Sequence, residues 1–329
     1  MTKNKPLIIE QINKKNTETK EEIYRRLKND YDLLLKERSN LNNNKNNSNN
    51  TTNNNTSNNN TNININNIRK KQDEAFQNFF KNQKFKPELD KAKVKFLRNN
   101  DFFIGIFDQN EKYPKKGILV NSYGDYYEGE FVNGKKDGEG KLIYKNGNKY
   151  EGFFSNGLRN GKGKLTQING EIYDGEWRNG EISGQGVRLH NNGDRYVGNH
   201  LDNVRNGIGI YYFANGDSYN GNWVKGNANG KGILKFKNGE IYEGKFKENN
   251  IYGIGTFKKK NGDIYTGDFK YGLINGKGKF ENALGEKYIG EFLEGKKHGM
   301  GKMYNKEGKI IQVGNWKNDQ FIGNIKQSI

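Results

Sequence analysis

The 329-residue sequence has no cysteine and only three prolines, and just 31% of its residues are hydrophobic. Without cysteine, disulfide bonds, thiolate metal sites and cysteine nucleophiles are excluded. The sequence has no apolar run long enough to span a membrane, and the apolar residues 7–9 are too few for a signal peptide. We therefore expect a soluble cytoplasmic protein without a deep aliphatic core.

Glycine, aromatic rings and positive charge are plentiful instead. The chain has 43 glycines, 12% aromatic residues and a formal net charge of +18. This charge favours acidic partners, either anionic lipid or acidic protein surfaces. Basic residues alternate with acidic ones after residue 100 and no nucleic-acid-binding motif is present, so nucleic acid is not an expected partner.

One pattern dominates the chain after residue 100. Tyr-x-Gly-x-aromatic, a loop and Gly-x-Gly return every 23 residues, with the tyrosine running from Tyr127 to Tyr288. The first glycine of Gly-x-Gly keeps the same interval from Gly138 to Gly299, and a third glycine keeps it from Gly124 to Gly308. Three markers in phase indicate a repeat array rather than one globular core.

The spacing within one repeat predicts a β-hairpin. Alternation puts the tyrosine, the glycine and the second ring on one face of a strand and polar residues on the other. Asn-Gly pairs such as Asn146-Gly147 predict type I′ turns between repeats. Glycines inside the strands predict that a ring of a neighbouring repeat lies over the bare backbone. We therefore expect a mostly β protein, an elongated single-layer antiparallel meander of 23-residue hairpins.

The tyrosine, glycine and second ring of each copy should pack the repeats together and present an aromatic stripe along a groove. A single-layer sheet would leave this stripe exposed for a partner. These residues are Tyr127, Gly129, Phe131, Tyr150, Gly152, Phe154, Tyr173, Gly175, Trp177, Tyr196, Gly198, Tyr219, Gly221, Trp223, Tyr242, Gly244, Phe246, Tyr265, Gly267, Phe269, Tyr288, Gly290 and Phe292.

The repeat resembles the MORN (membrane occupation and recognition nexus) family, whose pattern matches Tyr127 to Gly140 and its seven successors. Residues 103–107 and 312–316 look like degenerate terminal copies. The resemblance implies an elongated grooved sheet that serves as a scaffold under membranes or in cytoskeletal or ciliary assemblies. Some family members are linked to phosphoinositides, and others are fused to an enzyme.

The N-terminal third divides into three segments. Residues 1–40 contain a predicted helix at 17–39, and its stripe of Ile23, Leu27, Tyr31 and Leu34 either docks on the repeats or forms a coiled coil. Residues 41–67 are rich in asparagine and should be disordered. Residues 68–100 combine basic and aromatic residues, and residues 101–329 form the array.

The basic aromatic segment has two interpretations. Phe76, Phe79 and Phe80 share one predicted helix face, close to Lys70 and Lys71. They either cap the first open sheet edge, as repeat arrays require, or contact an anionic membrane or an acidic partner.

Some copies depart from the pattern. His200 replaces the second ring, Arg188 and His190 interrupt the apolar face, and Asn203 and Asn249 replace a loop glycine. Arg188, His190 and His200 could form a polar notch that binds a phosphate or carboxylate, or they could reflect drift in one copy.

The sequence contains no catalytic constellation, no metal-ligand cluster and no cofactor motif, so we expect no enzyme, no metal and no cofactor. The predicted function is a scaffold or adaptor that binds a protein partner on its grooved aromatic and glycine face. The alternatives are a peripheral membrane protein that binds anionic phospholipid, and a regulatory subunit of a separate enzyme such as a lipid kinase. A second copy could also pair with the C-terminal sheet edge near Ile325, giving a homo-oligomer.

Overall fold

A computed structural model describes residues 25, 29, 92–96, 101–107 and 114–324. Apart from Arg25 and Asn29, the predicted helix at 17–39 lies outside these residues, so that prediction stays untested. The Asn-rich linker and the side chains of Lys70, Lys71, Phe76, Phe79 and Phe80 lie outside them as well, and the predictions made for them also stay untested. The chain divides into two compact units, residues 1–168 and 169–329.

The first unit is an antiparallel meander in which each strand pairs with its neighbour in the chain. Its strands are β1 (Lys93–Phe96), β2 (Phe102–Phe107), β3 (Pro114–Val120), β4 (Tyr126–Val132), β5 (Lys135–Ile143), β6 (Lys149–Ser155) and β7 (Leu158–Thr166).

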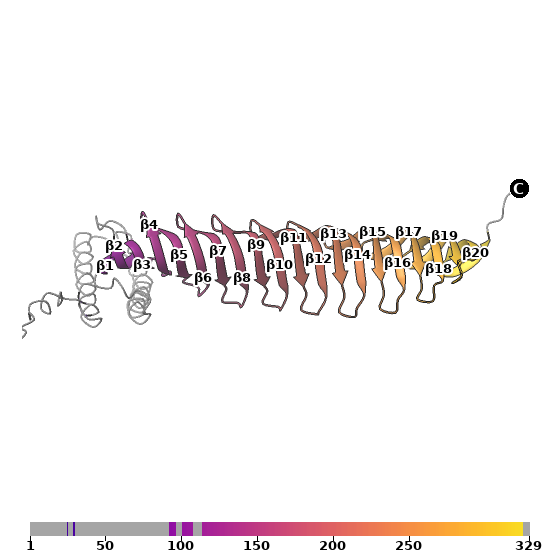
Figure 1. Ribbon diagram of the computed structural model, residues 1–329, viewed down its shortest axis with the longest axis horizontal. Coiled ribbons are helices and arrows are strands. Elements are labelled where there is room, and N and C mark those ends of the chain that lie inside the picture. The colour runs from indigo at the N-terminus through magenta and orange to yellow at the C-terminus, as the bar shows by residue number, and fades with distance from the viewer. Residues whose placement is uncertain (1–24, 26–28, 30–91, 97–100, 108–113, 325–329) are drawn as a thin grey trace, which may run out of the picture. The chain divides into compact units, whose positions relative to one another are not determined.

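The second unit continues the same plan, and Figure 1 shows its strands following one another in chain order. Its strands are β8 (Ile172–Arg178), β9 (Glu181–Leu189), β10 (Arg195–Leu201), β11 (Val204–Tyr212), β12 (Ser218–Val224), β13 (Asn227–Lys235), β14 (Ile241–Lys247), β15 (Asn250–Lys258), β16 (Ile264–Lys270), β17 (Leu273–Glu281), β18 (Lys287–Leu293), β19 (Lys296–Tyr304), β20 (Ile310–Lys317) and β21 (Gln320–Asn324). The predicted repeated hairpins are therefore confirmed within each unit.

The two ends of each hairpin use different turns, and the predicted turn type was assigned to the wrong end. At Asn146-Gly147 only the glycine has positive φ, and the Gly147 amide donates to the Tyr144 carbonyl, so the loop has three residues. The type I′ turns lie inside the repeats. Asn156 and Gly157, with φ of 50° and 88°, form one of them.

Several type I′ turns are tied to the preceding repeat by a backbone hydrogen bond. The Gly157 amide donates to the Lys136 carbonyl at 2.8 Å, and later turns repeat this bond. Where asparagine replaces the glycine, a second bond appears, because the Ile182 amide donates to Asn203 Oδ1 and the Ala228 amide donates to Asn249 Oδ1. These two departures from the pattern therefore add a contact between repeats.

Glycines form a floor for the tyrosine of their own repeat. A Cβ at Gly267 or Gly278 would overlap with the ring of Tyr265, and both glycines belong to the repeat that starts with that tyrosine. The Tyr265 hydroxyl continues past them and donates to the Asp268 carbonyl at 3.0 Å. The prediction that a neighbouring repeat supplies the ring was therefore wrong.

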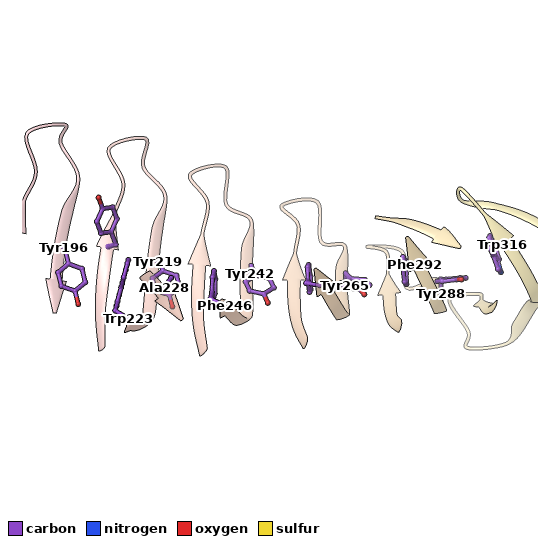
Figure 2. Packing of buried hydrophobic residues seen from close by; sticks show 12 residues of the cluster. Tyr196, Tyr219, Trp223, Ala228, Tyr242, Phe246, Tyr265, Tyr288, Phe292 and Trp316 are labelled. Carbon is purple, nitrogen blue, oxygen red and sulfur yellow. The ribbon is translucent and has the colours of Figure 1, made fainter. Parts of the chain in front are cut away.

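Neighbouring repeats are joined instead by edge-to-face aromatic contacts, which Figure 2 shows along the second unit. Tyr242 meets Phe246 of its own repeat at 5.3 Å and Phe269 of the next repeat at 5.0 Å between ring centroids. Tyr265 does the same with Phe269 and Phe292. Such pairs contribute about 0.5–1.5 kcal/mol each beyond their buried area, so stability is distributed along the chain.

This packing buries the aromatic stripe. Tyr242 and Tyr288 have 0% exposure and Phe292 has 6%, and the other tyrosines and second rings of the regular repeats are buried as well. The expected exposed stripe was wrong, because glycines below and neighbouring rings at the sides enclose each ring. We call the face that carries these rings the ring face and the opposite one the outer face.

The outer face changes along the chain. In the first unit it carries opposite charges on neighbouring strands, such as Lys141 and Glu151 at 2.8 Å. In the second unit Val187, Val197 and Ile210 face one another on β9, β10 and β11, where polar residues were expected.

No helix among the described residues is long and apolar enough to span a membrane.

Candidate partner-binding groove

A strip of partly exposed apolar side chains lies on the ring face of the second unit, on top of the buried rings. We call this strip the groove. Its residues pack against the buried aromatic cluster but are not themselves buried. They are Leu234, Ile251, Phe257, Ile274, Phe280 and Met303.

The groove contains a cavity of about 160 Å³. Phe257, Ile274 and Phe280 form its sides, and the buried rings of Tyr265 and Phe292 lie beneath. Residues from both hairpin ends line it, since Lys259 and Asp263 belong to a turn between repeats and Gly295 to a type I′ turn. The cavity therefore follows the direction of the strands.

One position in the repeat places a cation over the rings in several repeats. This position is the second residue of the second strand. Arg205 lies 4.4 Å from the Trp223 ring centroid, and Lys297 lies 5.1 Å from that of Trp316. The position is Ile182 in β9, Ala228 in β13, Ile251 in β15 and Ile274 in β17, and among these four Ile274 lines the cavity.

Two lysines and two aspartates line the ends of the cavity. Asp263 accepts hydrogen bonds from the Ala283 amide and the Asn261 side chain, and Asp319 accepts one from the Lys297 amide. The carboxylates of these aspartates are thus hydrogen-bonded to residues in or beside the turns. Lys259 and Lys297 take part in no ion pair with the described residues, so their ammonium groups are available to a carboxylate.

A polar cluster covers the ring face at the beginning of the second unit, over β8 to β12. Arg188 donates from Nε to Glu171 and from Nη1 to the Asn203 carbonyl. His190 Nδ1 lies 4.0 Å from the same Glu171 carboxylate. The Glu171 and Arg188 side chains are 17% and 26% exposed, so this pair is largely shielded from water.

Arg205 and Tyr211 extend the polar cluster. The Arg205 guanidinium lies 4.6 Å from the Tyr211 ring centroid and donates to the Gly226 carbonyl. The Tyr211 hydroxyl donates to Asp194 at 2.6 Å. Burial and this hydrogen bond raise the pKa of Tyr211 to about 12.

His200 lies beside this cluster as a ring in the aromatic row. It meets Tyr173 and Tyr196 edge to face at 5.1 and 5.0 Å and is 3% exposed. Neither ring nitrogen has a well-formed hydrogen bond within the described part of the chain. Burial, together with the Arg188 and Arg205 cations, lowers the pKa of His200 to about 4, so the ring is neutral at pH 7.

The structure thus brings Arg188, His190 and His200 into one region, and it also shows what fills the predicted notch. Glu171 supplies a carboxylate from within the chain, so no external anion is needed to balance Arg188. Sequence reasoning missed Glu171, Asp194 and Arg205. It also missed the groove. Among the described residues no group of acidic and histidine side chains could hold a metal ion.

Comparison with known proteins identifies the repeat. The MORN repeat family model matches eight consecutive segments: residues 127–149, 150–172, 173–195, 196–218, 219–241, 242–264, 265–283 and 288–309. These segments make up more than half of the chain. The chain therefore belongs to the MORN repeat family.

The solved structures that resemble this chain do so only weakly. The TCP10 domain of Danio rerio CPAP in complex with a peptide of Danio rerio STIL is 10% identical, with 68% of this chain and 99% of that chain covered and a TM-score of 0.34. The SAS-4 (dCPAP) TCP domain of Drosophila melanogaster, in complex with a proline-rich motif of Ana2, is 18% identical, with 55% and 86% covered and a TM-score of 0.30. Likenesses this weak carry no conclusion about partners. No curated protein matches the sequence.

Proposed function

We propose that this MORN-repeat protein is a non-enzymatic scaffold that binds a segment of a protein partner in the groove. The observation that carries the proposal is the row of partly exposed apolar side chains, Ile251, Phe257, Ile274 and Phe280 among them, above rings that are otherwise sealed. A hydrophobic strip enclosed by polar rims is a usual feature of peptide-binding grooves.

The charge pattern and the strand direction support a protein segment as ligand. The groove ends at two available ammonium groups and two hydrogen-bonded carboxylates, so it offers polar contacts at both ends and apolar ones between. An extended segment can lie along the cavity, which follows the strands, with its side chains against the apolar residues between the two ends.

A charge placed in the groove tests this function. Ile274→Lys introduces the residue type that the repeat already accepts at the same position in Lys136 and Lys297. The variant should fold normally and close the groove. We expect peptides selected from a random display library on the full chain to lose at least about tenfold in affinity for this variant.

Ile254→Lys is the matched control. It makes the same substitution in β15, on the outer face, where Ile254 is 65% exposed and lies opposite Asp268 of β16. It should leave binding unchanged. If Ile274→Lys and Ile254→Lys retain peptides equally, the groove is not the binding surface.

The membrane alternative depends on residues outside the described part of the chain. Lys70, Lys71, Phe76, Phe79 and Phe80 would provide the contact with anionic lipid, at a cytoplasmic membrane face. Liposomes with and without an acidic phospholipid, compared at low and high salt, test it directly. Loss of salt-sensitive binding in F79A combined with K70E and K71E would favour this alternative, and no binding to acidic liposomes at low salt would remove it.

A cytoskeletal or ciliary location, and association with a separate enzyme such as a lipid kinase, remain proposals of the same kind. Proximity labelling with the full chain separates these settings, and labelling that disappears in Ile274→Lys would connect the setting to the groove.

A further inference from the structure

The cavity in the groove has the size and lining of a site for one side chain. Its volume is about 160 Å³. A cavity of about 150 Å³ lined by apolar side chains is large enough to hold benzene. An aromatic side chain therefore matches the space.

The surrounding rings favour an aromatic occupant over an aliphatic one. Phe257 and Phe280 line the cavity, and Tyr265 and Phe292 below it already meet edge to face at 5.0 Å. An inserted ring could extend this arrangement, in which the electron-poor edge of one ring meets the electron-rich face of another.

The charged residues at the ends of the cavity favour particular residues next to the aromatic residue of the ligand. Asp263 and Asp319 are held by amide donors of the turns, whereas Lys259 and Lys297 have no ion pair within the described residues. The Lys297 ammonium already lies 5.4 Å from the Tyr288 ring centroid, so it is held near the end of the cavity. A carboxylate in the ligand would meet a positioned cation there.

We propose that the cavity binds one aromatic side chain of an extended protein segment that carries aspartate or glutamate within about two residues of it. This ligand chemistry rests on the proposed function, because it specifies what the groove binds. The aromatic residue would be the anchor that supplies most of the affinity, and the acidic residue would fix the direction of the segment.

The test uses the same display library, selected on the full chain and counter-selected on Ile274→Lys. Peptides that depend on the groove should be enriched in Phe, Tyr or Trp beside an acidic residue. Replacing the aromatic residue of a selected peptide by alanine should weaken binding about 30-fold, as for a central anchor. Replacing its acidic residue by the amide should weaken binding about two- to fivefold, since exposed ion pairs contribute little.

Two protein variants separate the parts of the proposal. Ile274→Phe should fill the cavity without adding charge and should weaken aromatic peptides about tenfold. Lys297→Gln should leave the aromatic preference intact and abolish the acidic preference. Circular dichroism and the midpoint of urea unfolding should show that both variants are folded, since each changes one partly exposed side chain.

The outcomes are distinguishable. Groove-dependent peptides with an aliphatic anchor or basic neighbours would overturn this inference and leave the proposed function standing. A library that yields no groove-dependent peptide would overturn both. A dimer of the full chain that dissociates in Ile274→Lys would place a second copy in the groove and would also overturn the inference.

Discussion

The polar cluster and the groove are two parts of the same ring face, built on the same floor of glycine and tyrosine. Over the cluster, Arg205 covers three rings and Glu171 balances Arg188, so the surface is filled from within the chain. Over the groove, Ile251 and Ile274 stand where some other repeats have a cation, and Ile274 lines the cavity. The same position is a buried isoleucine, Ile182, in the cluster and a cavity-lining isoleucine, Ile274, in the groove.

The largest effect should come from breaking the floor that the two regions share. Gly209→Val would overlap with the Tyr196 ring under the cluster, and Gly278→Val would overlap with Tyr265 under the groove. We expect each to lower the free energy of unfolding by about 3 kcal/mol or more, measured by urea denaturation. Lys277→Val, next to Gly278 and exposed, should have little effect. A clear difference between the two glycines would mean that the floors are not equivalent.

The next effect concerns the charges that close the cluster. Glu171→Gln removes the carboxylate that faces Arg188 and His190, and both side chains of the Glu171 and Arg188 pair are largely shielded from water. We expect a loss of about 1–2 kcal/mol in the free energy of unfolding. A double-mutant cycle with Arg188→Met isolates the pair. Lys259→Gln at the rim of the groove should barely change stability, and equal losses in both regions would contradict the comparison.

His200 gives the stability of the protein a pH dependence that originates beside the cluster. Its pKa is lowered from 6.5 to about 4 in the folded protein, so the unfolded chain binds a proton at higher pH than the folded chain does. Stability should therefore fall as the pH drops from 6.5 towards 4. Burial and Arg188 also lower the pKa of His190, which adds to the same trend.

His200→Phe tests this origin. Phenylalanine is the residue that Phe246 and Phe269 provide at the same position, and it removes two buried nitrogens without good partners. We expect a gain of about 1 kcal/mol at pH 7 and a flatter dependence between pH 6.5 and 4 in thermal denaturation. His190→Asn is the companion control. An unchanged slope in His200→Phe would assign the pH dependence elsewhere.

The smallest effect should come from introducing the asparagine side-chain hydrogen bond of other turns at Gly272, beside the groove. Asn203 and Asn249 each accept a bond from the preceding repeat, whereas Gly272 has positive φ and no neighbouring atom within 4 Å of an added Cβ. Gly272→Asn should allow its side chain to accept from the Ile251 amide and raise the unfolding free energy by about 0.5 kcal/mol. Calorimetry should show a small rise in Tm, and Gly272→Ala should lower it because alanine adds strain without the bond.

The sequence was sufficient for the repeat, its period, the antiparallel hairpins and the family, because each of these depends on local alternation and on glycine spacing. It was insufficient for the contacts above the strands. The ring over Gly267 comes from Tyr265 in the same repeat, which only the side-chain direction reveals. Likewise, an Asn-Gly pair such as Asn146-Gly147 is compatible with both a two-residue type I′ turn and a three-residue loop. The register of the strands that it joins decides between them.

The candidate site was less predictable than the fold. Arg188, His190 and His200 stood out as departures from the pattern, yet the partner that neutralises them, Glu171, lies 17 residues before Arg188 in the preceding repeat. Ile251 and Ile274 did not stand out because isoleucine is an ordinary strand residue. Their importance depends on the cation that occupies the same position in other repeats, so it becomes visible only when the repeats are compared in three dimensions.

The turn bonds and edge-to-face contacts described above lie within one repeat or connect it to the one before or after it. A duplication or loss of one whole 23-residue unit within such a run would therefore recreate every type of contact at the new junction. Gene slippage in steps of 69 nucleotides could lengthen or shorten the molecule without a new packing solution, whereas any other step would displace tyrosine from its glycines. The number of repeats can thus change while the contacts within and between them stay the same.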